Sequence, residues 1–338
     1  MPTLSQLTGE TRTIFKISGI ILGVIFIVFI AVTIKNILFP PPPPPPTVTF
    51  GKIQVSLPTS SKVFDYKIDT VTNSLPKIVS QEKVYKIEDQ KADLLALSRA
   101  TDRVRQVGFT DKGIKISENV YQWLDSSTGR TLTMNIMDNN FNMISNFIQG
   151  QNTPQFVGNA NTAISAAKDF LTRMGLYKPD FDDSKTQVAL FSVNNFALAP
   201  ASSISNTQVI KVSFFQKDIN GTPVFYPQTV TSPVNLLIGT VRGENQVVEA
   251  NFFFQKPSAT SSTYPLKTTQ EAFDDLKSGN AYITSYAGQN QTVSIRRVYL
   301  GYFISEKKQD FLFPIVVFEG NDSFQAFVSA VKDEWVNK

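Results

Sequence analysis

The chain contains no cysteine and no histidine in its 338 residues. Their absence excludes disulfide bonds, a thiol nucleophile, an imidazole base, and a zinc site built on thiolate or imidazole ligands. An enzyme made from this sequence would depend on serine, threonine, lysine, tyrosine and carboxylates. We find no catalytic set among them, so we expect a non-enzymatic protein with no catalytic residues, no cofactor and no metal ion.

Charge is also sparse, since only 18% of residues are charged and the formal net charge is +4. Three cations and one acid precede the proline run, which leaves a net charge of 4 − 2 = +2 for the rest of the chain. The basic doublets Arg296-Arg297 and Lys307-Lys308 are isolated. Binding to a phosphate backbone needs a stripe of Lys and Arg on one face, so we expect no nucleic-acid partner.

Hydrophobic residues are concentrated near the N-terminus. Residues 17–34 carry no charge, and thirteen of these eighteen are Ile, Leu, Val or Phe. Their insertion into a bilayer is worth about −4 to −8 kcal/mol. As a helix the stretch spans roughly 27 Å, and the apolar residues 37–39 lengthen it. A cleaved signal peptide has a shorter apolar part and a small-residue cleavage site. The sequence therefore predicts an uncleaved transmembrane anchor over residues 17–39.

The orientation and contacts of this anchor can also be read from the sequence. Arg12 and Lys16 precede the apolar stretch and Lys35 follows it, which favours residues 1–16 as a short cytoplasmic tail and an extracytoplasmic C-terminal body. Gly19 and Gly23 have the spacing that lets two helices in a bilayer approach closely. Glycine is common in such helices, so this pair fits both an ordinary span and a specific transmembrane helix contact.

Seven consecutive prolines follow the anchor, at residues 40–46. Such a run adopts the polyproline II helix, at about 3.1 Å per residue, and forms a stiff rod of roughly 22 Å. The sequence predicts that this spacer holds the body away from the lipid bilayer.

Three amphipathic helices are predicted in the body. The first covers about residues 89–107 and ends at Gly108, and the second covers about residues 162–174 and ends at Gly175. The third begins with Thr268-x-x-Glu271, which has the spacing of a capping box, and ends near residue 279.

Runs of strands are predicted after each helix, because apolar and polar residues alternate between turn signals. The clearest follow the first helix, at residues 120–124 and 131–136, with a turn at 127–129 between them. Pro314 lies in an apolar run and predicts an edge strand, since proline cannot donate to a sheet ladder. Further strands are predicted at residues 209–215, 234–241, 246–254, 293–303, 311–318 and 324–331.

A helix followed by antiparallel strands, repeated along the chain, predicts the α+β class. We expect repeated helix-on-antiparallel-sheet units after a single transmembrane helix. The units are assigned to residues 47–150, 151–257 and, for a smaller third unit, 258–338.

Two motifs require a test for chemistry. Ser165 and Lys168 have the Ser-x-x-Lys spacing of penicillin-binding enzymes, but the Lys-Thr-Gly element of those enzymes is missing. Asp180, Asp182 and Asp183 form a cluster without the spacing of a calcium loop. We interpret the first pair as the polar side of a helix and the aspartates as a solvated loop.

The body resembles the YycH/YycI-type regulators of two-component systems, which belong with proteins that carry PepSY-like units. The resemblance covers roughly residues 83–331, and its motifs are diffuse. It rests on residues 119–123 (Asn-Val-Tyr-Gln-Trp), 130–132 (Arg-Thr-Leu), 220–224 (Asn-Gly-Thr-Pro-Val), 269–273 (Thr-Gln-Glu-Ala-Phe), 298–302 (Val-Tyr-Leu-Gly-Tyr) and 313–317 (Phe-Pro-Ile-Val-Val).

This resemblance implies a membrane-anchored, extracytoplasmic and non-enzymatic regulator. Its implied partner is another membrane or envelope protein, with a sensor histidine kinase as the candidate, contacted through the transmembrane helix and the outer body. The family has no catalytic residues to carry over. The alternative from another functional class is an envelope hydrolase or peptidase-associated module, which requires a serine or carboxylate site.

Overall fold

The computed structural model describes residues 21–35, 44–58, 60, 62–88, 93–149 and 153–337. The chain divides between Pro45 and Pro46 into two compact units. In the first, residues 21–35 are helical. Among the described residues, no helix has the length and apolar character required to cross a membrane. The predicted tail, Gly19, both ends of the predicted anchor and residues 40–43 lie outside the described part of the chain.

The second unit contains two sheets, and we name two lobes after them. The central lobe comprises residues 93–149 and 153–256, and the terminal lobe comprises residues 46–58, 60, 62–88 and 257–337. The terminal lobe is therefore made from both ends of this unit, and the central lobe is inserted between them. The helices and the mostly antiparallel sheets of the two lobes confirm the α+β class.

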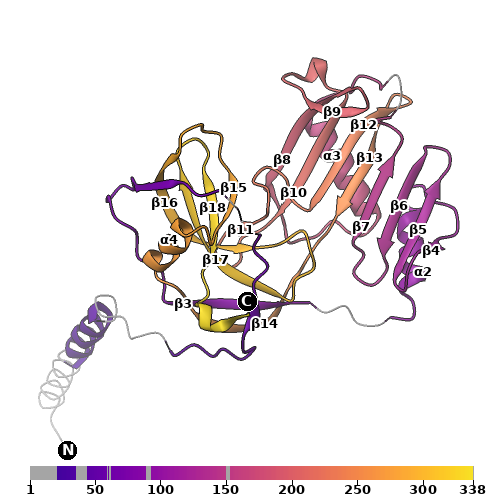
Figure 1. Cartoon of the computed structure of the whole chain (residues 1–338). Helices are drawn as coiled ribbons and strands as arrows, with labels where there is room; N and C mark the ends of the chain where they lie inside the picture. The colour runs from indigo at the N-terminus through magenta and orange to yellow at the C-terminus, as the bar shows by residue number, and fades with distance from the viewer. Residues whose placement is uncertain are drawn as a thin grey trace, which may run out of the picture. The chain divides into compact units, whose positions relative to one another are not determined.

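The central lobe is built on a nine-stranded sheet in the order β4-β5-β6-β7-β13-β12-β10-β8-β9 (Figure 1). Every neighbouring pair in it is antiparallel. The strands before residue 150 and those after it meet at the β7–β13 pair, so the first two predicted units contribute to one sheet. Its strands are β4 Ile114–Lys115, β5 Val120–Asp125, β6 Arg130–Asn135, β7 Phe141–Ser145, β8 Phe181–Asn194, β9 Ala197–Pro200, β10 Val209–Gln216, β12 Val234–Val241 and β13 Glu244–Phe252.

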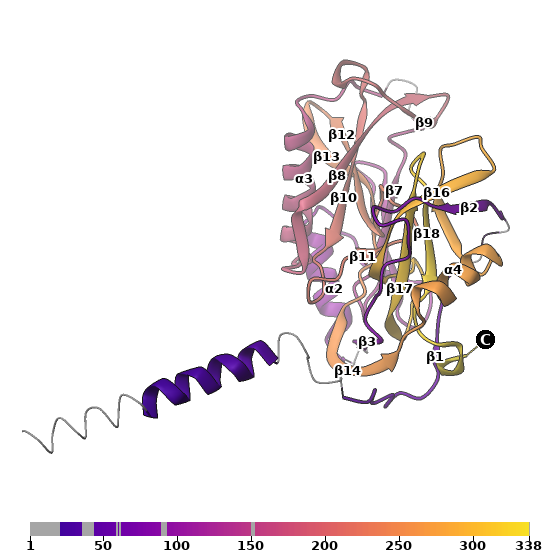
Figure 2. The same cartoon turned by 90° about the vertical axis from the view of Figure 1, so that its left-hand side faces the viewer.

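Two helices, α2 (Ala96–Arg105) and α3 (Ala160–Arg173), lie on the same face of this sheet (Figure 2). Small residues on both helices, Ala100 and Ala167 among them, are fully buried against the sheet. Trp123 on β5 is also fully buried in this core. At about 25 cal/mol per Å² of buried apolar surface, this core is the main source of stability of the lobe.

The predicted helix ends are confirmed in detail at the second and third helices. Asn159 forms a capping box with Thr162, so α3 begins at Ala160, two residues before its predicted start. Thr268 and Glu271 form the predicted capping box of α4 (Thr269–Lys277). Gly108 follows α2 with φ 103°, a left-handed conformation that favours glycine and ends the helix.

The first helix is shorter than predicted within the described residues. Residues 93–95 precede α2 without being helical, and the Asp93 carboxylate accepts a hydrogen bond from the Leu95 amide at 3.0 Å. This local bond competes with helical hydrogen bonding, which explains the later start. Residues 89–92 lie outside the described part of the chain.

The terminal lobe contains a second sheet in the order β11-β16-β17-β18-β15. The helix α4 packs on it, with the Phe273 and Phe318 ring centroids 6.2 Å apart. The strand β14 pairs with β3, and β3 in turn pairs with β17. The strands of the lobe are β1 Ile53–Gln54, β2 Asp65–Ile68, β3 Gln81–Ile87, β11 Val224–Phe225 (contributed from the central lobe), β14 Pro257–Pro265, β15 Tyr282–Ser285, β16 Thr292–Phe303, β17 Phe311–Gly320, β18 Gln325–Ser329 and β19 Val336–Asn337.

The segment that follows the prolines packs on this C-terminal sheet. The strand β1 pairs in parallel with β19 at the end of the chain, and β2 pairs in parallel with β16. Ile53 and Val84 are fully buried in the same core as β16, β17 and β18. The described residues between 46 and 88, which precede the first predicted helix, therefore pair with strands 170 to 283 residues later in the chain, from Ile87 opposite Pro257 to Ile53 opposite Val336.

The prediction that Pro314 marks an edge strand is wrong. The strand β17 lies between β16 and β18, and Pro314 is opposite Tyr302 of β16. The carbonyl of Pro314 accepts a hydrogen bond from the Ala330 amide at 3.1 Å, just beyond Ile315–Ser329, the last pair of the β17–β18 ladder. Pro314 has no N–H to donate, but its position lies beyond the last residue pair of the β17–β18 ladder. The proline therefore removes no regular hydrogen bond from the sheet.

Candidate functional site

A cleft with a volume of about 200 Å³ lies between the two lobes. The central lobe contributes Gln187 of β8 and Phe215 of β10, and the terminal lobe contributes Gln325 of β18. The remaining wall comes from β11 and the residues after it. In full, the lining residues are Lys185, Gln187, Phe215, Val224, Phe225, Tyr226, Gln228, Thr229 and Gln325.

The aromatic residues of the cleft are fixed in position by ring contacts and hydrogen bonds to neighbouring residues. Phe215 and Tyr226 pack edge to face with ring centroids 5.7 Å apart. The Tyr226 hydroxyl donates to the Gln216 side chain at 3.1 Å and accepts from the Gln216 amide at 3.2 Å. Burial raises the pKa of Tyr226, so its hydroxyl remains protonated at neutral pH. Phe225 packs on Phe327 of the terminal lobe, with ring centroids 5.2 Å apart.

A hydrogen-bond network around Gln255 joins the two lobes. The amide nitrogen of the buried Gln255 side chain donates to the backbone carbonyls of Ser305 at 3.1 Å and Lys307 at 3.2 Å. Its side-chain oxygen accepts from the Gln309 amide at 2.8 Å. Buried amides satisfied in this way act as rigid connectors between packed elements.

The cleft has little electrostatic character. Its one cationic group, Lys185, forms ion pairs with Asp218 and Asp182. The other polar lining groups are the amides Gln187, Gln228 and Gln325 and the hydroxyl of Thr229. Amides and hydroxyls both donate and accept hydrogen bonds, and Phe225, the partly exposed ring of the cleft, adds apolar surface. This arrangement suits an uncharged polar ligand.

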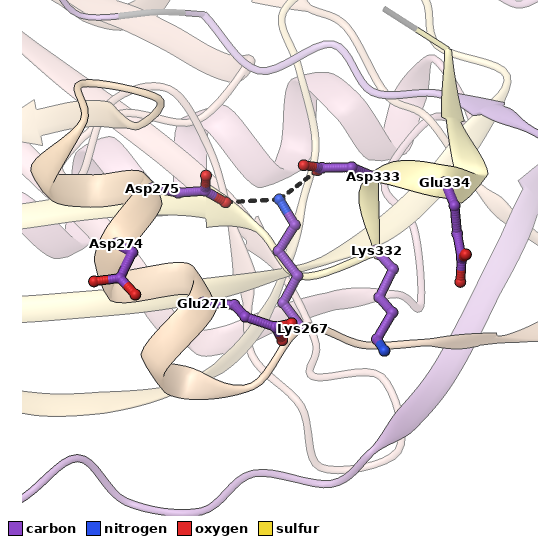
Figure 3. Close-up of a pocket in the computed structure, with 7 residues that line it drawn as sticks. All are labelled: Lys267, Glu271, Asp274, Asp275, Lys332, Asp333 and Glu334. Atoms are coloured by element: carbon purple, nitrogen blue, oxygen red, sulfur yellow. Dashed lines mark hydrogen bonds and ion pairs between the residues drawn. The ribbon is translucent and has the colours of Figure 1, made fainter.

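A second hollow, of about 410 Å³, lies in the terminal lobe between α4 and the C-terminal segment (Figure 3). The Lys267 ammonium group lies between two carboxylates, 2.7 Å from Asp275 and 2.6 Å from Asp333. Burial alone would lower the pKa of Lys267, but hydrogen bonds to both carboxylates raise it. Glu271 is used in the helix cap. These pairings tie the chain end to α4 and account for most of the charge.

A third hollow, of about 650 Å³, lies in the central lobe where α2 and α3 end. Arg130 is buried there and forms an ion pair with Asp125 at 2.8 Å. Burial would raise the pKa of Asp125, but hydrogen bonds from Ser127, Thr128 and Arg130 lower it well below its usual range. Arg173 of α3 donates to the carbonyl of Gln106, the C-terminal cap of α2, at 3.3 Å. These cations stabilise the helix ends and a buried carboxylate.

The residues of the Ser-x-x-Lys motif and of the aspartate cluster lie on α3, on β8 and just before β8. Lys168 on α3 forms an ion pair with Asp183 at 2.8 Å, and Ser165 is exposed on the same helix. Asp182 and Asp183 lie on β8, so their assignment to a loop is wrong. No group of three or more acidic residues among the described residues has the geometry of a metal site. At Gly23 an added Cβ would meet no atom within 4 Å, and Gly19 lies outside the described residues.

The sequence did not single out the cleft residues. Gln187, Gln228 and Gln325 are separated widely along the chain and lie in no motif. The run Phe225-Tyr226 was the one available signal, because adjacent aromatic residues on a strand face opposite sides. The topology brings these residues together by pairing β11 with β16 of the other lobe.

No known protein-family model matches the chain, and no curated protein matches it. A solved structure described as an uncharacterized protein from Eubacterium rectale ATCC 33656 is similar to it, with 12% sequence identity and a TM-score of 0.38. The match covers 74% of this chain and 82% of that chain.

Proposed function

We propose that this chain is a membrane-anchored, extracytoplasmic binding protein of the YycH/YycI type that regulates another envelope protein, with a sensor histidine kinase as the candidate partner. The observation that carries the proposal is the N-terminal helix. Every Ile, Leu, Val and Phe in residues 21–35 is between 40% and 67% exposed. A helix that is apolar on all sides is stable only when other apolar material, here a lipid bilayer, surrounds it.

The order of elements supports PepSY-like repeated units. Each body helix is followed by consecutive antiparallel strands: α2 by β5, β6 and β7, α3 by β8, β10, β12 and β13, and α4 by β16, β17 and β18. A unit of this kind leaves sheet surface available for a partner, as expected of a protein that acts by binding.

The attachment of the spacer also fits a tethered body. The Thr47 amide donates to the Thr263 hydroxyl at 2.9 Å, and the Thr49 amide donates to the Ser262 hydroxyl at 2.7 Å. Both acceptors lie on β14. The body therefore begins immediately after the prolines.

The proposal is tested with the paired substitution Gly19→Ile and Gly23→Ile in the full chain. Both changes keep insertion favourable and fill the face on which another helix would pack. We expect co-purification with the membrane partner to be lost, while expression and the melting temperature of the body stay unchanged. The matched control is Val24→Ile with Val28→Ile, which has the same spacing on another face of the helix.

Orientation is measured in the same variants with a single added thiol, because the chain has no cysteine. Ser126→Cys is exposed in the body, and a membrane-impermeant maleimide should label it in intact cells. A cysteine placed at Ser5 should be labelled only after lysis. Labelling of Ser5→Cys in intact cells would refute the proposed orientation. If the Gly19→Ile, Gly23→Ile variant kept all its partners, the helix would only anchor the body and would not bind the partner.

A further inference from the structure

A row of uncharged polar side chains crosses the central sheet. Seven strands contribute one residue each, and every residue lies directly opposite the next in the strand register. With neighbouring strands about 4.8 Å apart, the row is roughly 29 Å long. We call these residues the polar row: Gln122, Thr133, Asn142, Asn251, Asn235, Ser213 and Gln187.

The polar row lies on the face of the sheet opposite α2 and α3, because its residues alternate along each strand with residues of the core that these helices cover. Its residues alternate with core residues that pack toward the helices. Thr133 lies between the buried Leu132 and Met134, and Ala250 and Phe252, which flank Asn251, are buried in the same core. The row therefore belongs to the face that the helices leave open.

Several groups in the row are available for a ligand. Asn142 and Gln187 are exposed, and their side chains make no hydrogen bond within the described residues. The side-chain nitrogens of Asn235 and Asn251 each donate to a backbone carbonyl at 2.8 Å. Their side-chain oxygens receive no hydrogen bond from the described residues, so they can accept one from outside.

The row leads directly into the cleft between the lobes. Gln187, its last residue, also lines the cleft, together with Gln325 and the aromatic residues Phe215 and Tyr226. Ser213, which lies between Asn235 and Gln187, is only 2% exposed, so a long molecule would contact the exposed residues on both sides of it and then reach the cleft at Gln187. This continuity distinguishes the row from an ordinary solvated sheet surface.

The chemistry of the surface selects among possible ligands. The row contains no charged residue, so a polyanion such as nucleic acid finds no counter-charge there. An apolar protein surface would leave its amides without partners, which is unfavourable. A sugar chain instead offers a hydroxyl at almost every carbon and can satisfy both donors and acceptors. Leu124 and Ile144, beside the row and 46% and 55% exposed, can contact a methyl group.

We propose that the polar row and the cleft bind an extended, uncharged glycan built of N-acetylhexosamine units. Its hydroxyl and acetamido groups would pair with the row, its acetamido methyl groups would contact Leu124 and Ile144, and a terminal ring would stack in the cleft. This inference goes beyond the regulatory function proposed above and does not depend on the membrane partner.

The test is titration calorimetry of the full chain in detergent with a hexamer of β-linked N-acetylglucosamine. We expect saturable binding that is insensitive to salt. The double variant Asn142→Leu and Gln187→Leu should bind about tenfold more weakly, because two hydrogen bonds are lost. Neither side chain has a structural partner in the described chain, so folding should be unaffected. The matched control Asn161→Leu, on α3 at the opposite face, should bind like the wild type.

Three further results would overturn the proposal. The first is an absence of heat from the wild-type chain at millimolar hexamer. The second is equal binding of a glucose hexamer with the same linkage, which lacks the acetamido groups. The third is preference for heparin, or for an extended neutral peptide, over the N-acetylglucosamine hexamer. Unchanged melting of the double variant, measured in parallel, ensures that weaker binding reports the site.

Discussion

The two lobes of the body treat their sheets differently. In the central lobe, β6 alternates between buried and partly exposed residues, because helices cover one of its faces. In the terminal lobe, seven consecutive residues of β17, Leu312–Phe318, are buried. One face of β17 is covered by α4, through Phe273 and Phe318, and the opposite face is covered as well.

This difference shows that a sheet can be covered on both faces by strands and loops from other parts of the chain as well as by helices. The terminal lobe has one body helix, α4, and its remaining cover comes from residues 46–58 and 62–88 and from the contact with the central lobe. The central lobe has two helices on one face, and part of its other face carries the polar row. The central sheet thus has a core on one face and a polar row on the other, whereas β17 in the terminal lobe is buried on both faces.

The comparison predicts that replacing an apolar residue with alanine destabilises the fold far more in the terminal lobe than on the open face of the central sheet. Phe303 is fully buried in the terminal lobe, with its ring centroid 5.9 Å from that of Phe327 and 6.2 Å from that of Phe313. Phe303→Ala should lower the free energy of unfolding by about 3–5 kcal/mol. Ile144→Ala on the open face should change it by less than about 0.5 kcal/mol. Urea unfolding measures both, and similar losses would mean that the open face is covered.

The second largest effect is expected at the buried ion pair of the central lobe. Asp125→Asn leaves the Arg130 guanidinium buried without its counter-charge, so unfolding free energy at neutral pH should fall by about 3 kcal/mol. The folded-state pKa of Asp125 is lowered, so its stabilisation is complete above the unfolded pKa of about 3.9 and is lost as pH falls below it.

The pH dependence provides the check on this second prediction. The difference in stability between wild type and Asp125→Asn should be constant from pH 7 to about pH 5 and should narrow below about pH 4. Denaturant titrations at several pH values measure it. A gap that stays constant down to pH 2 would show that the carboxylate does not titrate differently in the two states.

The smallest effect is predicted where the spacer joins the terminal lobe. The Ser262 hydroxyl contacts the Thr47 and Thr49 hydroxyls at 2.8 Å each, besides accepting from the Thr49 amide. Ser262→Ala should cost about 1–2 kcal/mol and speed proteolysis within residues 47–57. Mass spectrometry of limited digests detects the cleavage. Cleavage that is instead accelerated in the central lobe would contradict a local role for this contact.

Much of the secondary structure could be predicted, because local patterns specify it. The capping box at Thr268 and the glycine after α2 are local signals, and both were read correctly. The strands at residues 120–124 and 234–241 have clear turns or alternation and were also found. The start of α2 was less accurate, since the Asp93 bond that competes with helix formation leaves no periodic signal.

The candidate site was largely beyond sequence analysis. Gln187 and Asn142 carry no motif, and they align only because β8 and β7 are joined through the three intervening strands β10, β12 and β13. Pro314 illustrates the same limit. Its residue type indicates an edge, but where its missing N–H points depends on where the neighbouring ladder ends.

Composition and short-range pattern alone determined the apolar N-terminal stretch, the proline run, the absence of thiol and imidazole chemistry, and the α+β class. Each depends on the identities of neighbouring residues, through helix geometry, strand alternation or side-chain chemistry. Only the tertiary structure decided that β1, β2 and β3 pair with C-terminal strands, that the first two predicted units share one sheet, and that a polar row ends in a cleft. These features depend on pairing between strands that are distant in the sequence. The pairing is selected by how well the whole fold buries its apolar residues, and no local sequence pattern specifies it.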